Sequence, residues 1–91
     1  MAVTVRIPTT LRPLSGGNKL VEVPAGNLTD IIAALEASYP GFADRLLDAD
    51  GGLHKFVNLF VDDDDVRYLD GLNTMVADGI TVSIIPAVAG G

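Results

Sequence analysis

One stretch of the chain has helical periodicity, and the stretches on both sides of it have the alternation of strands. From Asn27 to Tyr39, apolar residues recur every three or four positions, which predicts an amphipathic helix of about three turns. Asn27 is a favourable N-cap, and Asp30 favours the start of a helix. Pro40-Gly41 ends the pattern. The apolar face of a single helix needs a second layer, so the helix is expected to pack against a sheet.

Strands are expected from the alternation of apolar and polar residues, with a short extra one between the last two longer stretches. They cover residues 3–7, 19–23, 56–61, 66–68 and 80–85. The stretch 8–18 contains two prolines and Gly16-Gly17, which predicts a loop that joins the first two strands as a hairpin. Short helical turns are expected over 42–47 and 72–76. The order predicts an α+β fold with one main helix across a mixed sheet of four to five strands.

The last strand runs into a proline and then into a diglycine. Pro86 cannot donate a ladder hydrogen bond and biases Ile85 towards extended backbone, so the strand is expected to stop there. The following residues are small or slim, and Gly90 and Gly91 lack a Cβ, so the tail could enter a narrow passage in another protein. We therefore expect a folded domain over 1–86 and a flexible tail over 87–91. The alternative is a frayed terminus without a role.

Composition narrows the classes of function. The 91 residues contain no cysteine, which excludes disulfides, thiolate metal sites and thiol nucleophiles within the chain. Six Lys and Arg against twelve Asp and Glu give a net charge of -6, which argues against nucleic acid and anionic membranes. The charge favours a basic protein partner. Because no secretory leader and no membrane-spanning apolar run is visible, a cytoplasmic location is expected.

No catalytic residue and no metal site is expected. His54 has no partner pattern for acid-base chemistry and is interpreted as a loop residue. The acidic run Asp62 to Asp65 is interpreted as a solvated turn, because Arg67 and Asn73 occupy the positions where an EF-hand requires Gly and Glu.

A candidate binding patch follows from strand alternation. Phe60 and Ile85 are out of phase with the inward apolar residues of their strands, so both are expected to be exposed near the root of the tail. Large apolar residues on a solvent face often mark a partner-binding patch. The alternative is that the segment 41–56 covers Phe60.

These features together resemble the ThiS/MoaD sulfur-carrier family, which has the β-grasp, or ubiquitin-like, fold. The ending from Asp78-Gly79 through Gly91 is similar to the family's ending, and residues 56–67 are similar to its central strand and turn. The similarity covers the whole chain. Within the family, the Ala-Val-Ala-Gly-Gly tail resembles that of the carriers of an actinobacterial cysteine pathway.

The resemblance implies a carrier and not an enzyme, with no bound cofactor. A partner of the ubiquitin-activating type would use ATP to convert the Gly91 carboxylate into an acyl-adenylate. A sulfur donor, sulfide or a persulfide, would then displace AMP and leave a thiocarboxylate. Gly90, Ala89, Val88 and Ala87 would thread the tail into a partner's active site, and a downstream biosynthetic enzyme would accept the sulfur.

The resemblance leaves the pathway open between cysteine, thiamine, molybdopterin and a specialised metabolite. Two other functions also remain open. One is a ubiquitin-like protein modifier that forms isopeptides through Gly91. The other is a non-catalytic ubiquitin-like interaction module with an inert tail.

Overall fold

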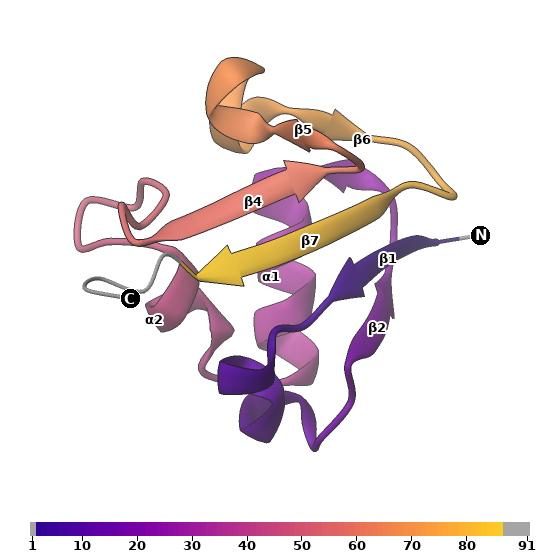
Figure 1. Cartoon of the computed structure of the whole chain (residues 1–91), viewed down its shortest axis with the longest axis vertical. Helices are drawn as coiled ribbons and strands as arrows, with labels where there is room; N and C mark the ends of the chain where they lie inside the picture. Colours follow the sequence, from indigo (N-terminus) through magenta and orange to yellow (C-terminus); the bar gives the residue numbers. More distant parts are fainter. Residues whose placement is uncertain (1, 87–91) are drawn as a thin grey trace.

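The computed structural model describes residues 2–86, and the predicted tail over 87–91 lies outside the described residues. Figure 1 shows a main sheet with the longest helix crossing one of its faces. The elements in chain order are β1 (Val3–Arg6), η1 (Thr9–Ser15), β2 (Leu20–Val23), β3 (Gly26–Asn27), α1 (Leu28–Ser38), α2 (Phe42–Leu46), β4 (Val57–Val61), β5 (Asp64–Asp65), η2 (Val66–Tyr68), η3 (Gly71–Asn73), β6 (Met75–Val76) and β7 (Thr81–Pro86). Elements labelled η are 3-10 helices. Within residues 2–86, no helix is long and apolar enough to cross a membrane.

The main sheet has five strands in the order β2-β1-β7-β4-β5. The last long strand, β7, therefore lies at the centre, parallel to β1 and antiparallel to β4. Strands β1 and β2 form the expected antiparallel hairpin. The expected α+β fold with a mixed sheet is confirmed.

Helix α1 begins where the sequence predicts. The Asn27 side chain accepts a hydrogen bond from the Asp30 N–H at 2.9 Å, and the Asp30 carboxylate accepts one from the Asn27 N–H at 3.4 Å. This reciprocal capping box satisfies N–H groups that have no partner inside the helix. The expected apolar stripe of α1, formed by Leu28, Ile31, Ile32 and Leu35, is buried.

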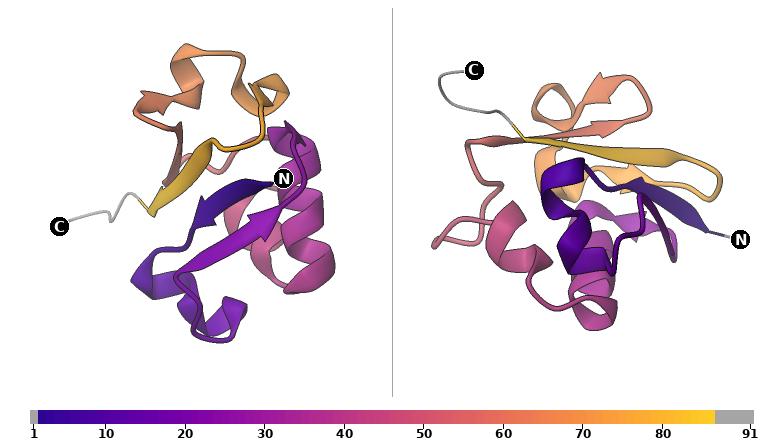
Figure 2. Two further views of the ribbon diagram at one scale, coloured as in Figure 1. Left: turned by 90° about the vertical axis from the view of Figure 1, so that its right-hand side faces the viewer. Right: turned by 60° about the horizontal axis from the view of Figure 1, so that its bottom comes forward.

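Helix α1 lies against one face of the sheet in the views of Figure 2, and the buried apolar residues of both elements form one core cluster. Inward residues alternate along each strand: Val3 and Val5 on β1, Val21 and Val23 on β2, Val57 and Leu59 on β4, and Val82 and Ile84 on β7. Phe42 and Leu46 of α2 are completely buried and extend the core beyond the end of α1. Because period-2 alternation places these side chains on one face, residues such as Ile85 point to the other.

The segment 8–18 differs from the expected loop. Residues 9–15 form η1, with Leu11 and Ser15 buried. The Ser15 hydroxyl lies 2.6 Å from the Asn18 carbonyl oxygen, which satisfies this buried polar group. Gly16 then takes a φ of 65°, where a left-handed residue ends the helix. The burial of Leu11 thus favours a 3-10 helix in a segment whose composition alone favoured an irregular turn.

Two other local predictions were wrong. Residues 66–68 form the 3-10 helix η2 and not a strand, because the Asp65 carboxylate accepts a hydrogen bond from the Arg67 N–H at 2.9 Å and caps a turn. The short strand of this region is β5, two residues earlier. The expected helical turn over 72–76 is divided between η3 and β6, and β6 pairs with β3 in a second, two-stranded sheet.

Candidate functional site: the C-terminal end of β7

The end of β7 is held in the sheet up to its last described residue. Along β4, Ile85 lies opposite Asn58 and Pro86 lies opposite Val57. The pairing with β1 ends earlier, at Ser83. Pro86 has no N–H to donate, so the ladder is not continued from this residue. The strand therefore fixes the position and direction of the chain at Pro86.

The residues expected to act beyond this point lie outside the described residues. They are Gly91, as the site of adenylation and thiocarboxylate formation, and Gly90, Ala89, Val88 and Ala87, as the threading segment. Their roles remain predictions. The described residues define what surrounds the root of the tail.

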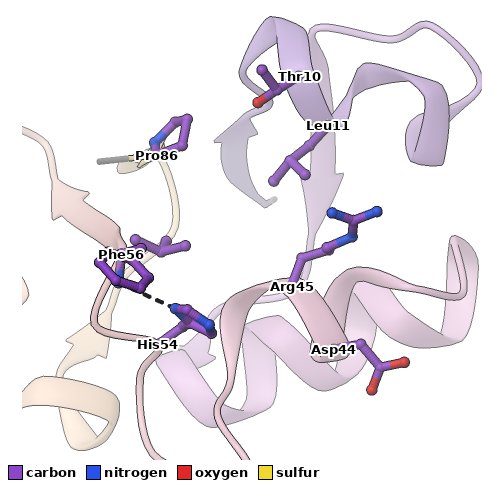
Figure 3. A pocket seen from close by; sticks show the side chains of 8 residues that line it. Thr10, Leu11, Asp44, Arg45, His54, Phe56 and Pro86 are labelled. Carbon is purple, nitrogen blue, oxygen red and sulfur yellow. Dashed lines mark hydrogen bonds between the residues drawn. The ribbon is translucent and has the colours of Figure 1, made fainter. Parts of the chain in front are cut away.

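An open pocket of about 450 Å³ adjoins the root of the tail, with Pro86 as one of its walls. Thr10 and Leu11 of η1 and Arg45 of α2 line it together with His54, Phe56 and Val57 at the start of β4. Figure 3 shows the Arg45 guanidinium extending towards Leu11, whereas the Asp44 carboxylate points away from Phe56 and His54. The pocket therefore has a cation and two aromatic rings near Pro86, the last described residue.

The loop at the edge of this pocket is ordered by its own side chains. His54 Nδ1 accepts a hydrogen bond from the Phe56 N–H at 3.1 Å, and the two rings lie 5.6 Å apart between centroids. The Lys55 ammonium lies 5.2 Å from the centroid of the Phe56 ring, within the range of a cation-π interaction. His54 is thus a loop residue that shapes the turn before β4, as the sequence indicated.

Phe60 and Ile85 lie on the outer face of the sheet, opposite α1. The register places Asn58 opposite Ile85 and Ser83 opposite Phe60, so the two apolar residues are diagonal neighbours within reach of one another. Ile85 is 46% exposed, whereas Phe60 is partly buried. Their assignment as a partner-binding patch remains a prediction.

The acidic turn serves the fold. The Asp62 carboxylate accepts a hydrogen bond from the Thr81 N–H at 3.2 Å and so joins the end of β4 to the start of β7. Asp65 caps η2. Among residues 2–86, no three His, Cys, Asp or Glu side chains are grouped so that they could hold a metal ion.

The sheet order, the single crossing helix and the central last strand define a β-grasp protein of the ubiquitin-like type. The chain belongs to the ThiS family, whose model matches residues 5–91. This confirms the family and the fold that the sequence indicated.

Particular relatives match this chain over all or part of its length. The sulfur carrier protein CysO of Mycobacterium tuberculosis is 53% identical over 93 residues, which cover 100% of both chains. A chain in the crystal structure of the Amycolatopsis orientalis BexX/CysO complex is 47% identical with a TM-score of 0.93, covering 99% of this chain and 100% of that chain. Small archaeal modifier protein 3 of Haloferax volcanii is 44% identical over 62 residues, covering 68% of this chain and 66% of that protein.

Sequence reasoning missed the pocket beside Pro86. Its walls come from η1, α2 and the start of β4, which are distant in sequence. The composition of 8–18 predicts a loop, which gives no reason to place Thr10 and Leu11 beside the last strand. The exposed Phe56 immediately before β4 was the one local signal, since a large apolar residue at a strand's edge has no core position.

Proposed function

We propose that this protein is a sulfur carrier whose Gly91 carboxylate is adenylated and converted to a thiocarboxylate. The observation that carries the proposal is the 53% identity, over the full length of both chains, to a protein named as a sulfur carrier. The fold supports it, because the central strand β7 ends at Pro86, five residues before Gly91. A short tail on a fixed strand is suited to delivery into another protein's active site.

The proposed chemistry balances with ATP and a sulfur donor as co-substrates of the partner. A carboxylate oxygen of Gly91 attacks the α-phosphorus of ATP, which forms the acyl-adenylate and releases pyrophosphate. Sulfide then attacks the acyl carbon and AMP leaves, so one oxygen of the carboxylate is replaced by sulfur. With a persulfide donor, a thiol must afterwards reduce the acyl disulfide. The thiocarboxylate is a better nucleophile than a carboxylate and can transfer its sulfur to an electrophile.

The carrier itself contributes binding and positioning. In this proposal it performs no catalytic step, works in the cytoplasm and meets two partners in turn: a ubiquitin-activating-type enzyme and a sulfur-accepting biosynthetic enzyme. The patch of Phe60 and Ile85 would contact them on the face beside the tail. A relative of this chain forms the BexX/CysO complex, which supports the idea of a protein partner.

Intact-mass spectrometry tests the carrier function. The protein is incubated with a cognate adenylating enzyme, ATP and sulfide, beside a variant that lacks Gly90 and Gly91. The full chain is expected to gain the mass of one oxygen-to-sulfur exchange, and the shortened chain to gain none. If the full chain gains no mass with an enzyme that loads a known carrier, the proposal is wrong.

A second candidate is protein modification through the same carboxylate. The similarity to small archaeal modifier protein 3 over 62 residues favours it. The modifier would share the adenylation step and then form an isopeptide bond between Gly91 and a lysine amine of the target. Affinity isolation of tagged protein from its native cells is followed by digestion with a protease that cleaves after small residues such as Ala89, since no Lys or Arg follows Arg67. Lysines that carry a Gly-Gly remnant then separate this candidate from a carrier that leaves no conjugates.

A further inference from the structure

The six lysines and arginines of this acidic chain gather around one end of β7. In sequence they are scattered: Arg6, Arg12, Lys19, Arg45, Lys55 and Arg67. In the fold they form two groups, one on each side of the point where the chain leaves the sheet. This gathering contrasts with the net charge of -6 and was not visible in the sequence.

The first group lies beside the end of β1. Arg6, Arg12 and Lys19 line an open pocket of about 230 Å³ together with Leu20. Arg6 lies opposite Ser83 in the parallel pair of β1 and β7, two residues before the exposed Ile85. The Arg12 guanidinium donates to the Ile7 carbonyl oxygen at 3.2 Å, a neutral partner that holds the side chain without neutralising its charge.

The second group lies on the β4 side of the tail's root. Arg45 and Pro86 line the same open pocket, and Lys55 lies over the exposed Phe56 ring. Arg67 donates to the Asn58 side-chain oxygen at 2.6 Å and to the His54 carbonyl oxygen at 2.9 Å. Both acceptors are neutral, so Arg67 is held in place beside the residue that faces Ile85 while it keeps its charge.

The opposite end of β7 has the opposite charge. Asp62 and Asp78 flank its start, and Glu22 lies opposite Thr4, which itself pairs with Thr81 at that start. None of the six cations lies there. Some acidic residues do lie near the tail end, among them Asp44 in the pocket lining, but the Asp44 carboxylate points away from the aromatic wall (Figure 3).

Apolar residues are interspersed with the cations on the outer face of the sheet. One row across the strands contains Leu20, Arg6, Ser83 and Phe60 and ends at Asp65 on the edge strand β5. Leu20 is 50% exposed and Ile85 is 46% exposed. Exposed apolar side chains combined with arginines are the composition that protein interfaces favour.

We propose that this face, with Arg6, Lys19, Leu20 and Arg67 around Phe60 and Ile85, docks onto an acidic surface of the protein that receives the tail. Carboxylates around the partner's tail passage would pair with the two cation groups, and the apolar residues would be buried between them. This inference rests on the proposed carrier function and specifies its partner. It differs from the expectation of a basic partner, because the local charge at the docking face is opposite to the net charge.

The charge separation would orient the carrier during encounter. An acidic partner surface attracts the cationic end of the domain and repels the acidic end, so the tail approaches first. Such steering acts mainly on the association rate and weakens as salt screens the charges.

A pair of matched variants tests the inference. The first, R6Q/K19Q, removes two charges at the tail end with little change in side-chain size. The second, A25E/A77E, adds two negative charges at exposed positions near the start of β7, so both variants have the same net charge. The association rate with the cognate adenylating enzyme is measured by stopped flow across a series of salt concentrations, after circular dichroism has shown that both variants are folded.

The R6Q/K19Q variant is expected to associate about tenfold more slowly at low salt and to have a weaker salt dependence. The A25E/A77E variant is expected to change the rate by less than about twofold. Equal rates for the two variants, faster association of R6Q/K19Q, or no binding of the unmodified chain would overturn the inference. The mass assay decides the carrier function separately: if every form gains sulfur while the association rates are equal, only the docking inference fails.

Discussion

The two ends of β7 differ in how their polar groups are used. At the start, the Gly79 N–H donates to the Ala2 carbonyl oxygen at 2.9 Å, and the Asp62 carboxylate accepts from Thr81. At the other end, Pro86 donates no hydrogen bond, Ile85 is half exposed, and the guanidinium groups of Arg12 and Arg67 donate to neutral oxygens. At the start of β7, polar groups form hydrogen bonds within the chain, and these bonds help to specify the fold. The C-terminal end of β7 leaves charge and apolar surface available to another molecule.

The largest expected effect is a loss of stability from a substitution on the buried face of β7, near its C-terminal end. Ile84 is 3% exposed and packs in the core, so Ile84→Ala should lower the free energy of unfolding by about 3 kcal/mol through lost burial and a cavity. Urea denaturation measures this. A loss below about 1 kcal/mol would mean that the tail end of β7 is not anchored by the core.

The adjacent residue should behave in the opposite way. Ile85→Ala removes a side chain on the outer face, so stability should change by less than about 1 kcal/mol while affinity for the adenylating enzyme falls about tenfold. Isothermal titration calorimetry with both alanine variants separates the two faces of one strand. Unchanged affinity of Ile85→Ala would remove Ile85 from the partner patch.

A substitution at the start of β7 should affect stability alone. Gly79 has a φ of +87° and nothing within 4 Å of a built Cβ, so Gly79→Ala should cost about 1 kcal/mol from backbone strain without a clash. Thermal unfolding measures the cost. The sulfur-loading rate at a temperature where the variant is folded should be unchanged, and slower loading would contradict the division between the two ends.

The smallest expected effect is at Asp62. Asp62→Ala removes the acceptor for the Thr81 N–H and leaves alanine at a φ of 54°, which should cost about 1 kcal/mol or less. Asp62→Asn keeps a side-chain oxygen and tolerates this backbone conformation, so it should cost less than about 0.5 kcal/mol. Equal losses for the two variants in urea denaturation would show that the hydrogen bond contributes nothing.

The sequence predicted the elements that local patterns define. Helix α1 could be predicted because the capping pair Asn27 and Asp30 precedes a regular apolar stripe, and β7 because alternation is bounded by Asp78-Gly79 and Pro86. Helix η1 could not, because the burial of Leu11 depends on tertiary packing that overrides turn-forming composition. The pairing of β3 with β6 joins segments far apart in sequence, and two-residue strands have no periodicity to detect.

The candidate site could likewise be predicted from the sequence in part. Alternation placed Phe60 and Ile85 on one face because both belong to regular strands. The gathering of the six cations was not predictable, since it depends on the parallel pairing of β1 with β7 and on the position of α2. Net charge averages over the surface and predicts a basic partner, whereas the charge around the C-terminal end of β7 supports the acidic partner that we propose.

The most direct test of the central claim is to locate the sulfur. The loaded protein is cleaved by a protease, and the C-terminal peptide is fragmented by tandem mass spectrometry. The account predicts that the oxygen-to-sulfur exchange maps to Gly91 alone, in the chain with an intact diglycine. An exchange on any other residue, or an unmodified C-terminal peptide from protein treated with a competent enzyme, would contradict it.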